Sequence, residues 1–186
     1  FDFLTYPLVT LGFPLCICLY LNREGFKKSV KKLVGYSVEW GLGYVGLWTM
    51  KWILSDLLVG SNTIKDALAV VFERTDSVQN VSRIQGFLQV VVQNIGVYTN
   101  WPFVLFAGGI LLWLLWHVWC VRKQLLGRCN LSESIVFLPV ALFPFAWFFL
   151  VQNHSQEHWM YTCKILSVSV FAVLCAVGRF LNEQAK

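Results

Sequence analysis

Long apolar runs without charged side chains alternate with short polar stretches along this chain. Residues 3–21, 101–121 and 134–151 contain no Asp, Glu, Lys or Arg. A helix rises about 1.5 Å per residue, so about 20 apolar residues cross the roughly 30 Å hydrocarbon core of a bilayer. Two further runs of this length carry few charges. The pattern predicts five membrane-spanning helices, near residues 3–21, 33–52, 101–121, 134–151 and 160–178.

Composition supports a membrane class. Hydrophobic residues make up 57% of the chain and charged residues only 13%, whereas a soluble domain carries about 25% charged residues. The net charge of +5 does not indicate a nucleic-acid partner, because the basic residues gather at the ends of apolar runs. We therefore expect a single all-α domain over residues 1–186, a polytopic transmembrane helix bundle whose main partner is the lipid bilayer.

The distribution of Lys and Arg predicts the orientation. Basic residues concentrate in residues 22–32, after Val121 and in the tail, and the positive-inside rule places these segments in the cytoplasm. The outer loop, residues 60–100, and residues 152–157 should then face outward. We expect a multi-pass cell-membrane protein with residue 1 extracytoplasmic and the carboxyl terminus cytoplasmic. Because Phe1 already lies in an apolar run, we also expect an upstream half of the same parent chain.

The outer loop has helical patterns of its own. Ile64, Leu68 and Phe72 recur at helical spacing within residues 62–75, which predicts an amphipathic helix in the membrane interface. Within residues 81–98, glutamines recur every four positions and form one polar stripe. This stripe is either a solvated face or the lining of a substrate groove; its residues are Gln85, Gln89 and Gln93.

The apolar run over residues 33–59 contains charged residues, which are unusual in a membrane helix, and several glycines. Charged groups inside a span are costly and usually face the bundle interior, so we list Glu39, Lys51 and Asp56 as intramembrane charges with either a structural or a functional role. Small residues in a span allow close helix packing. We therefore expect helix-packing positions at Gly35, Gly43 and Gly46.

The polar segment before the last run contains His154-Ser155-Gln156-Glu157-His158, which matches the H-x-x-E-H pattern of zinc proteases. Such a site needs a third protein ligand, and no recognisable motif supplies one. No cofactor is therefore predicted, and a divalent metal at His154, Glu157 and His158 is the minor alternative. The favoured interpretation is that Asn153 caps the last helix and Gln156 completes a capping box.

Several short motifs carry a family resemblance. Phe1-Asp2-Phe3-Leu4-Thr5-Tyr6-Pro7, Met50-Lys51-Trp52 and Asn153-His154-Ser155 with His158 resemble the carboxyl-terminal half of uncharacterised polytopic bacterial membrane proteins. These are similar in layout to GT-C-type glycosyltransferases, which transfer sugars from polyprenyl-phosphate donors at the outer face. The resemblance implies a general base upstream of Phe1 and an Arg after the Asn-His-Ser motif, where this chain has Lys164.

The resemblance also implies roles for individual residues. His154, His158 and Lys164 would bind the phosphate of a polyprenyl-linked sugar donor, while Asn153 and the glutamine stripe would orient the sugar or the acceptor. The candidate substrate-binding residues are Asn153, His154, Glu157, His158, Lys164, Gln85, Gln89 and Gln93. Two alternatives stay open, a transporter or flippase component that depends on Glu39 and Lys51, and a non-catalytic membrane scaffold subunit.

Overall fold

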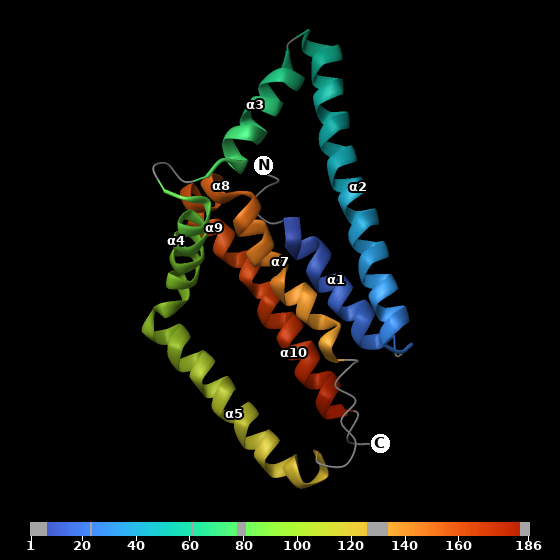
Figure 1. Ribbon diagram of the computed structural model, residues 1–186, viewed down its shortest axis with the longest axis vertical. Helices are drawn as coiled ribbons and strands as arrows, with labels where there is room; N and C mark the ends of the chain where they lie inside the picture. The colour runs from blue at the N-terminus through green and yellow to red at the C-terminus, as the bar shows by residue number, and fades with distance from the viewer. Residues whose placement is uncertain (1–6, 23, 61, 78–80, 126–133, 183–186) are drawn as a thin grey trace.

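The fold is helical throughout the described part of the chain. The computed structural model describes residues 7–22, 24–60, 62–77, 81–125 and 134–182, and all regular structure in these ranges is α- or 3-10-helix (Figure 1). This confirms the all-α class. Residues 3–6 of the first predicted span and the motif at residues 1–7, except Pro7, lie outside the described residues.

Three apolar helices form the centre of the molecule: α1 (Pro7–Leu21), α7 (Phe137–Leu150) and α10 (Leu166–Asn182). They lie side by side in Figure 1. Phe13 of α1 stacks on Phe171 of α10 with ring centroids 4.7 Å apart. The helices enclose an apolar core, so burial of hydrocarbon surface holds them together in this arrangement; its fully buried residues include Cys16, Val140, Phe148, Val168 and Ala172.

One end and the middle of this three-helix centre are fixed by polar contacts. At the end that follows α1, Arg179 Nη1 donates to the Tyr20 carbonyl over 2.8 Å. In the middle, Ser169 Oγ donates to the Ala141 carbonyl over 2.7 Å. These bonds fix the position of α10 along the axes of α1 and α7. The carboxyl end of α10 therefore lies beside the carboxyl end of α1, at the opposite end of the centre from the α7–α10 connection.

A long helical hairpin projects from one side of the centre. α2 (Phe26–Val59) has 34 residues and is about 51 Å long, and α3 (Thr63–Thr75) turns back from its end toward the α7–α10 connection (Figure 1). Trp40 Nε1 of α2 donates to Thr10 Oγ1 of α1 over 3.1 Å. α3 has no buried residue. The predicted helix over residues 62–75 is confirmed, and its location in a membrane interface stays a prediction.

Asp56 caps α3. Its Oδ1 accepts from Thr63 N over 2.6 Å and its Oδ2 from Ile64 N over 3.4 Å, which satisfies two of the first amides of a helix that lacks a side-chain bond from its own N-cap, Asn62. Gly60 makes the turn possible because its φ of 64° lies in the left-handed region. The carboxylate of Asp56, predicted as an intramembrane charge, is thus the cap of α3 at the hairpin turn.

We expect Asp56→Ala to loosen the start of α3. Loss of a cap costs about 1 kcal/mol, and hydrogen exchange at the Thr63 and Ile64 amides should accelerate about fivefold. Exchange measured by mass spectrometry on the detergent-solubilised protein tests this. Glu39→Ala is the matched control, because Glu39 is an exposed acid on the same helix. Equal exchange in both variants would contradict the assigned cap.

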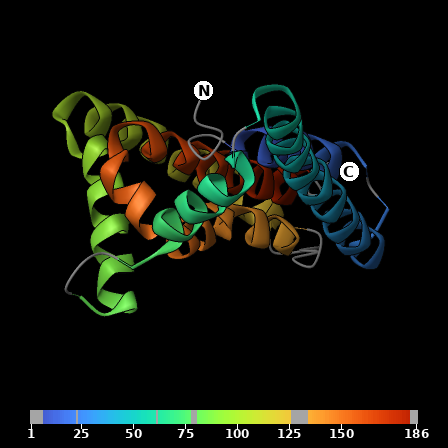
Figure 2. The same cartoon turned by 90° about the horizontal axis from the view of Figure 1, so that it is seen from above.

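On the other side of the centre lie α4 (Arg83–Gly96), the 3-10 helix η1 (Val97–Thr99) and α5 (Trp101–Leu125). α4 and η1 meet α5 at a bend of 86°, and α5 then runs away from the central helices, so that α2 and α5 flank them on opposite sides (Figures 1 and 2). α5 begins at Trp101, where the predicted span begins, and has Pro102 in its first turn. Most described side chains of α5 are exposed, Trp101, Phe106, Leu112 and Trp116 among them.

Length and composition single out fewer membrane spans than the hydropathy pattern predicts. Residues Trp159–Phe180 form one run long and apolar enough to cross a bilayer, and Arg83–Thr99 with Trp101–Trp116 add a second if the bent pair is one span. α1 and α7 are apolar but have only 15 and 14 residues. The described residues therefore contain one or two spans by this measure, rather than five.

The predicted glycine packing positions are wrong within the described residues. A Cβ built at Gly35, Gly43 or Gly46 meets no heavy atom within 4 Å, because the central helices touch α2 only lightly. The close approach occurs instead at Gly12 of α1, where an added Cβ would lie against the side chain of Val168. Gly12 therefore lets α1 and α10 pack at their observed separation.

Candidate functional site

The polar segment that the sequence singles out is a broken helical turn between α7 and α10. It consists of α8 (Gln152–Glu157), α9 (Trp159–Thr162) and the 3-10 helix η2 (Cys163–Ile165). Val151 (φ −118°, ψ 59°) ends the helical conformation before α8, and His158 (φ −110°, ψ 30°) ends it after α8. The single last helix predicted from His154 onward is therefore interrupted, and the turn folds back over the end of the bundle.

The expected helix cap at Asn153 is wrong. α8 begins at Gln152 after Val151 and has no side-chain cap. Asn153 instead joins the turn to the end of α3: its Nδ2 donates to the Glu73 carbonyl and its backbone N–H to the Asp76 carbonyl, both over 3.3 Å. The last carbonyls of a helix lack intrahelical donors. Asn153 thus satisfies two acceptors at the end of α3 and holds α3 against α8.

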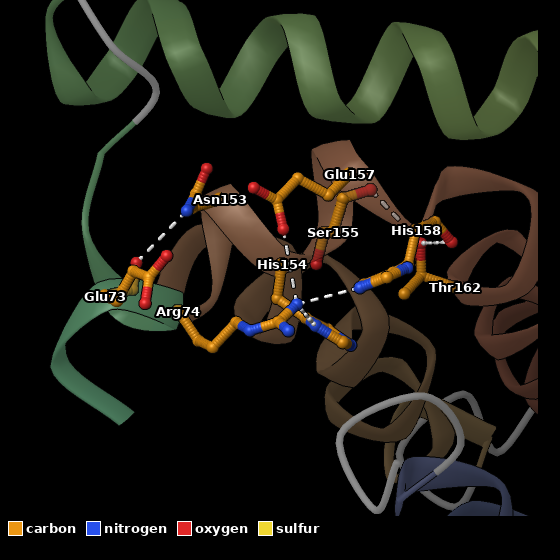
Figure 3. Close-up of polar contacts among 8 residues, drawn as sticks. All are labelled: Glu73, Arg74, Asn153, His154, Ser155, Glu157, His158 and Thr162. Atoms are coloured by element: carbon orange, nitrogen blue, oxygen red, sulfur yellow. Dashed lines mark hydrogen bonds and ion pairs between the residues drawn. The ribbon is translucent and has the colours of Figure 1, made fainter. Parts of the chain in front are cut away.

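An arginine from α3 enters the histidine pair. Arg74 Nη1 lies 2.9 Å from His154 Nδ1, 2.8 Å from His158 Nε2 and 3.3 Å from Glu157 Oε2, and Figure 3 shows all three bonds meeting at this nitrogen. His154 is fully buried, while the Arg74 side chain is 25% exposed and the Glu157 side chain 51% exposed. We call these four residues the Arg74 cluster.

The hydrogen bonds define the state of both imidazoles. A guanidinium has only donors, so each histidine nitrogen that faces Arg74 must offer a lone pair. The proton of His154 is then on Nε2 and that of His158 on Nδ1, and both rings are neutral. The cluster therefore presents one arginine charge, held by two neutral acceptors and one half-exposed carboxylate.

The same geometry does not fit a divalent metal. A zinc ion would use histidine lone pairs and a third ligand, but the lone pairs of His154 Nδ1 and His158 Nε2 point at a guanidinium. In the ranges that the structure describes, no group of three His, Cys, Asp or Glu side chains is placed to hold a metal ion. His154, Glu157 and His158 are thus ligands of Arg74 in this arrangement.

A buried polar network fixes the turn to α4, and no local sequence pattern predicts this network. Asn94 Nδ2 donates to the Val90 carbonyl over 2.9 Å and to the Ser155 carbonyl over 3.3 Å. Thr162 Oγ1 donates to Asn94 Oδ1 over 2.8 Å. Asn94, Ser155 and Thr162 are fully buried. Because buried polar groups must be paired, this network defines how α8 and α9 lie on α4.

The glutamine stripe does not join the Arg74 cluster. Gln85 forms a capping box with Ser82 at the start of α4, which is a structural role. Gln89 is exposed and Gln93 half-buried. In the described part of the chain neither makes a hydrogen bond to the cluster, so the solvated-face interpretation of the stripe agrees better with the geometry than the groove lining does.

The remaining candidates are exposed. Lys164 lies in η2, with its Nζ 5.6 Å from the ring centroid of Tyr161. Glu39 and Lys51 are exposed on α2. Of the candidates from the sequence, the structure brings together His154, Glu157 and His158, with Asn153 beside them, and it adds Arg74.

An apolar cavity lies next to the turn. It has a volume of about 570 Å³ and opens between α1, α4, α7 and α10. Tyr98, at its wall, donates its hydroxyl to the Cys163 carbonyl of η2 over 3.0 Å. The cavity therefore borders η2, the last part of the turn, and among the described residues that line it none belongs to the Arg74 cluster; its other lining residues include Phe13, Ile95, Phe145, Leu166 and Phe171.

Comparisons of the chain with family models, curated proteins and solved structures found no match.

Proposed function

We propose that the protein is a multi-pass membrane protein whose helices make five crossings, with the Arg74 cluster at the outer face. The tie between Arg179 and Tyr20 supports this orientation, because it brings the end of α10 to the end of α1, close to the lysines that open α2. The cluster lies at the opposite end of the central helices (Figure 1). Under the positive-inside rule, the lysine-rich end is cytoplasmic.

The exposed apolar surface supports a bilayer as the surrounding solvent. Soluble monomers rarely expose contiguous apolar patches above a few hundred Å², whereas α2 and α5 expose large apolar side chains over much of their length. In hydrocarbon, the backbone groups of such helices are satisfied internally. The most exposed examples are Leu42, Leu47, Leu57, Leu58, Val59, Trp101, Phe106 and Leu112.

We further propose that the protein takes part in sugar transfer from a polyprenyl-phosphate-linked donor at this outer face. The observation that supports it most is the Arg74 cluster, a guanidinium held by His154 and His158 on a turn whose last part, η2, borders an apolar cavity through Tyr98. A cation and a hydrocarbon-lined space along one turn complement an amphiphile that has an anionic head and an apolar tail. In this proposal the turn binds the donor.

Incorporation of a labelled polyprenyl-linked sugar in native membranes tests the proposal. We expect transfer in the wild type and at least a tenfold loss in His154→Ala and His158→Ala at matched expression, about 1.4 kcal/mol of lost binding or transition-state stabilisation. Glu39→Gln is the matched control on α2 and should retain activity.

Other outcomes identify the competing functions. Loss of function in Glu39→Gln with His154→Ala tolerated would favour a transporter or flippase component. If function is unchanged in both Glu39→Gln and His154→Ala, and the wild type transfers no sugar, a scaffold subunit is favoured. Either outcome contradicts the sugar-transfer proposal.

A further inference from the structure

Arg74 uses only one of its three guanidinium nitrogens to hold the cluster. His154, His158 and Glu157 all bond to Nη1. Among the residues that the structure describes, Nε and Nη2 make no hydrogen bond. These two nitrogens form one edge of the planar group and carry parallel N–H donors, the arrangement that matches two oxygens of a phosphate or carboxylate.

The contacts of the cluster also hold the Nε–Nη2 edge of Arg74 in one orientation before a ligand binds. Three acceptors on Nη1 restrict rotation of the guanidinium, so less side-chain entropy remains to be lost on binding. The side chain is 25% exposed, so the group is accessible while most of it is shielded from water. A shielded cation attracts an anion more strongly than one in bulk water.

We propose that the Nε–Nη2 edge of Arg74 is an oxyanion-binding site that takes a phosphate group in two parallel hydrogen bonds. The inference deepens the proposed function and rests on it for the identity of the phosphate. It changes the roles given to the histidines: His154 and His158 contact the far nitrogen of Arg74, and the arginine contacts the ligand.

Charged side chains near Arg74 affect the affinity of its Nε–Nη2 edge for an anion. Glu157 bonds to Nη1, and Glu73 and Asp76 are exposed at the end of α3. Arg83 donates to the Thr75 and Phe149 carbonyls over 3.4 and 3.5 Å and adds a second positive charge nearby. Glu157→Gln removes a competing anion, so this variant should bind phosphate more tightly than the wild type.

Thermal unfolding of the full-length protein in detergent, with added inorganic pyrophosphate, tests the site. A ligand that binds only the folded state raises the unfolding midpoint. We expect a rise in the wild type and in Lys65→Gln, which removes a positive charge from the same helix. Arg74→Lys should bind about tenfold more weakly, since it retains the charge but loses the paired donors. Arg74→Gln should show no rise.

A second measurement works on the unaltered protein in case the Arg74 variants do not fold. Phenylglyoxal modifies accessible arginines, and mass spectrometry locates the product. Pyrophosphate should slow modification several-fold at Arg74 and leave the exposed Arg83 unchanged. The site would be overturned if neither pyrophosphate nor a short polyprenyl monophosphate raised the wild-type midpoint, if the rise were equal in Arg74→Gln, or if neither ligand slowed modification of Arg74.

Repeating both experiments with a short polyprenyl monophosphate distinguishes a free phosphate from a lipid head group. Protection of Arg74 by the ester alone assigns a lipid head group, and protection by both ligands shows that the phosphate suffices; each result upholds the site. If the phosphate ligands bind in an Arg74-dependent way but no sugar is transferred, only the transferase proposal is contradicted. If sugar is transferred but neither ligand protects Arg74, only the oxyanion site is contradicted.

Discussion

Gly12→Leu is expected to destabilise the protein by about 3 kcal/mol, the upper part of the range for overpacked cores. An added Cβ at Gly12 would lie 3.0 Å from Val168 Cγ2 and closer still to Cγ1, and Val168 is fully buried and β-branched, so it has little freedom to move. The better helix propensity of Leu returns only about 1 kcal/mol. Denaturant unfolding of the detergent-solubilised protein measures the difference.

Gly43→Leu is the matched control for this substitution. A Cβ at Gly43 meets no atom within 4 Å, so the same change on α2 should leave stability equal or slightly higher. Val168→Ala in the Gly12→Leu background should restore part of the loss, because it removes the methyl groups that the new side chain meets. Equal stability of Gly12→Leu and wild type would contradict the packing of α1 on α10.

Asn94→Leu should cost about 2 kcal/mol. The substitution nearly preserves volume but removes the nearest acceptor of Thr162 Oγ1 and a donor to the Ser155 carbonyl. Thr162 Oγ1 keeps the Ser155 and His158 carbonyls as acceptors over 3.2 Å, so the cost stays within the range of about 1–3 kcal/mol for a buried polar group that loses a partner. The loss should also free α8 from α4. Denaturant unfolding reports the stability, and hydrogen exchange across residues 152–162 reports the loosened turn.

The double variant Asn94→Leu with Thr162→Val separates the hydrogen bond from packing. Removing both partners should restore part of the loss, because Thr162 then has no hydroxyl that lacks its nearest acceptor, whereas the Ser155 carbonyl loses both side-chain donors. Gln89→Leu, at an exposed position of the same helix, should change stability by no more than about 0.5 kcal/mol. If Asn94→Leu and Gln89→Leu unfold alike, the network contributes nothing to holding the turn.

The sequence predicts the helices well because each is encoded locally. Apolar runs and the pair Trp101-Pro102 locate α5, and the spacing of Ile64, Leu68 and Phe72 locates α3. The interruption at His158 has no local signal, since neither Gly nor Pro lies there. It follows from the contacts of the turn with α3 and α4, which sequence periodicity does not contain.

The candidate site was predictable only in part for the same reason. The spacing of His154 and His158 places them one turn apart, and the structure keeps the rings close, with centroids 4.7 Å apart. Arg74, by contrast, is one cation on an amphipathic helix, a pattern typical of a solvated face. The structural alternative for Asp56 has the same limit, because the sequence does not show that the α3 amides of Thr63 and Ile64 are its partners.

The distance along the chain between the two halves of the Arg74 cluster determines when the site can first exist. Arg74 lies 80 residues before His154 and 84 before His158, and synthesis runs from the amino end. A nascent chain that stops before residue 158 contains α3 and its arginine but only part of the acceptor set. The cluster therefore forms only after α7 and the following turn have been made, and an intact cluster identifies a chain whose synthesis has passed that turn.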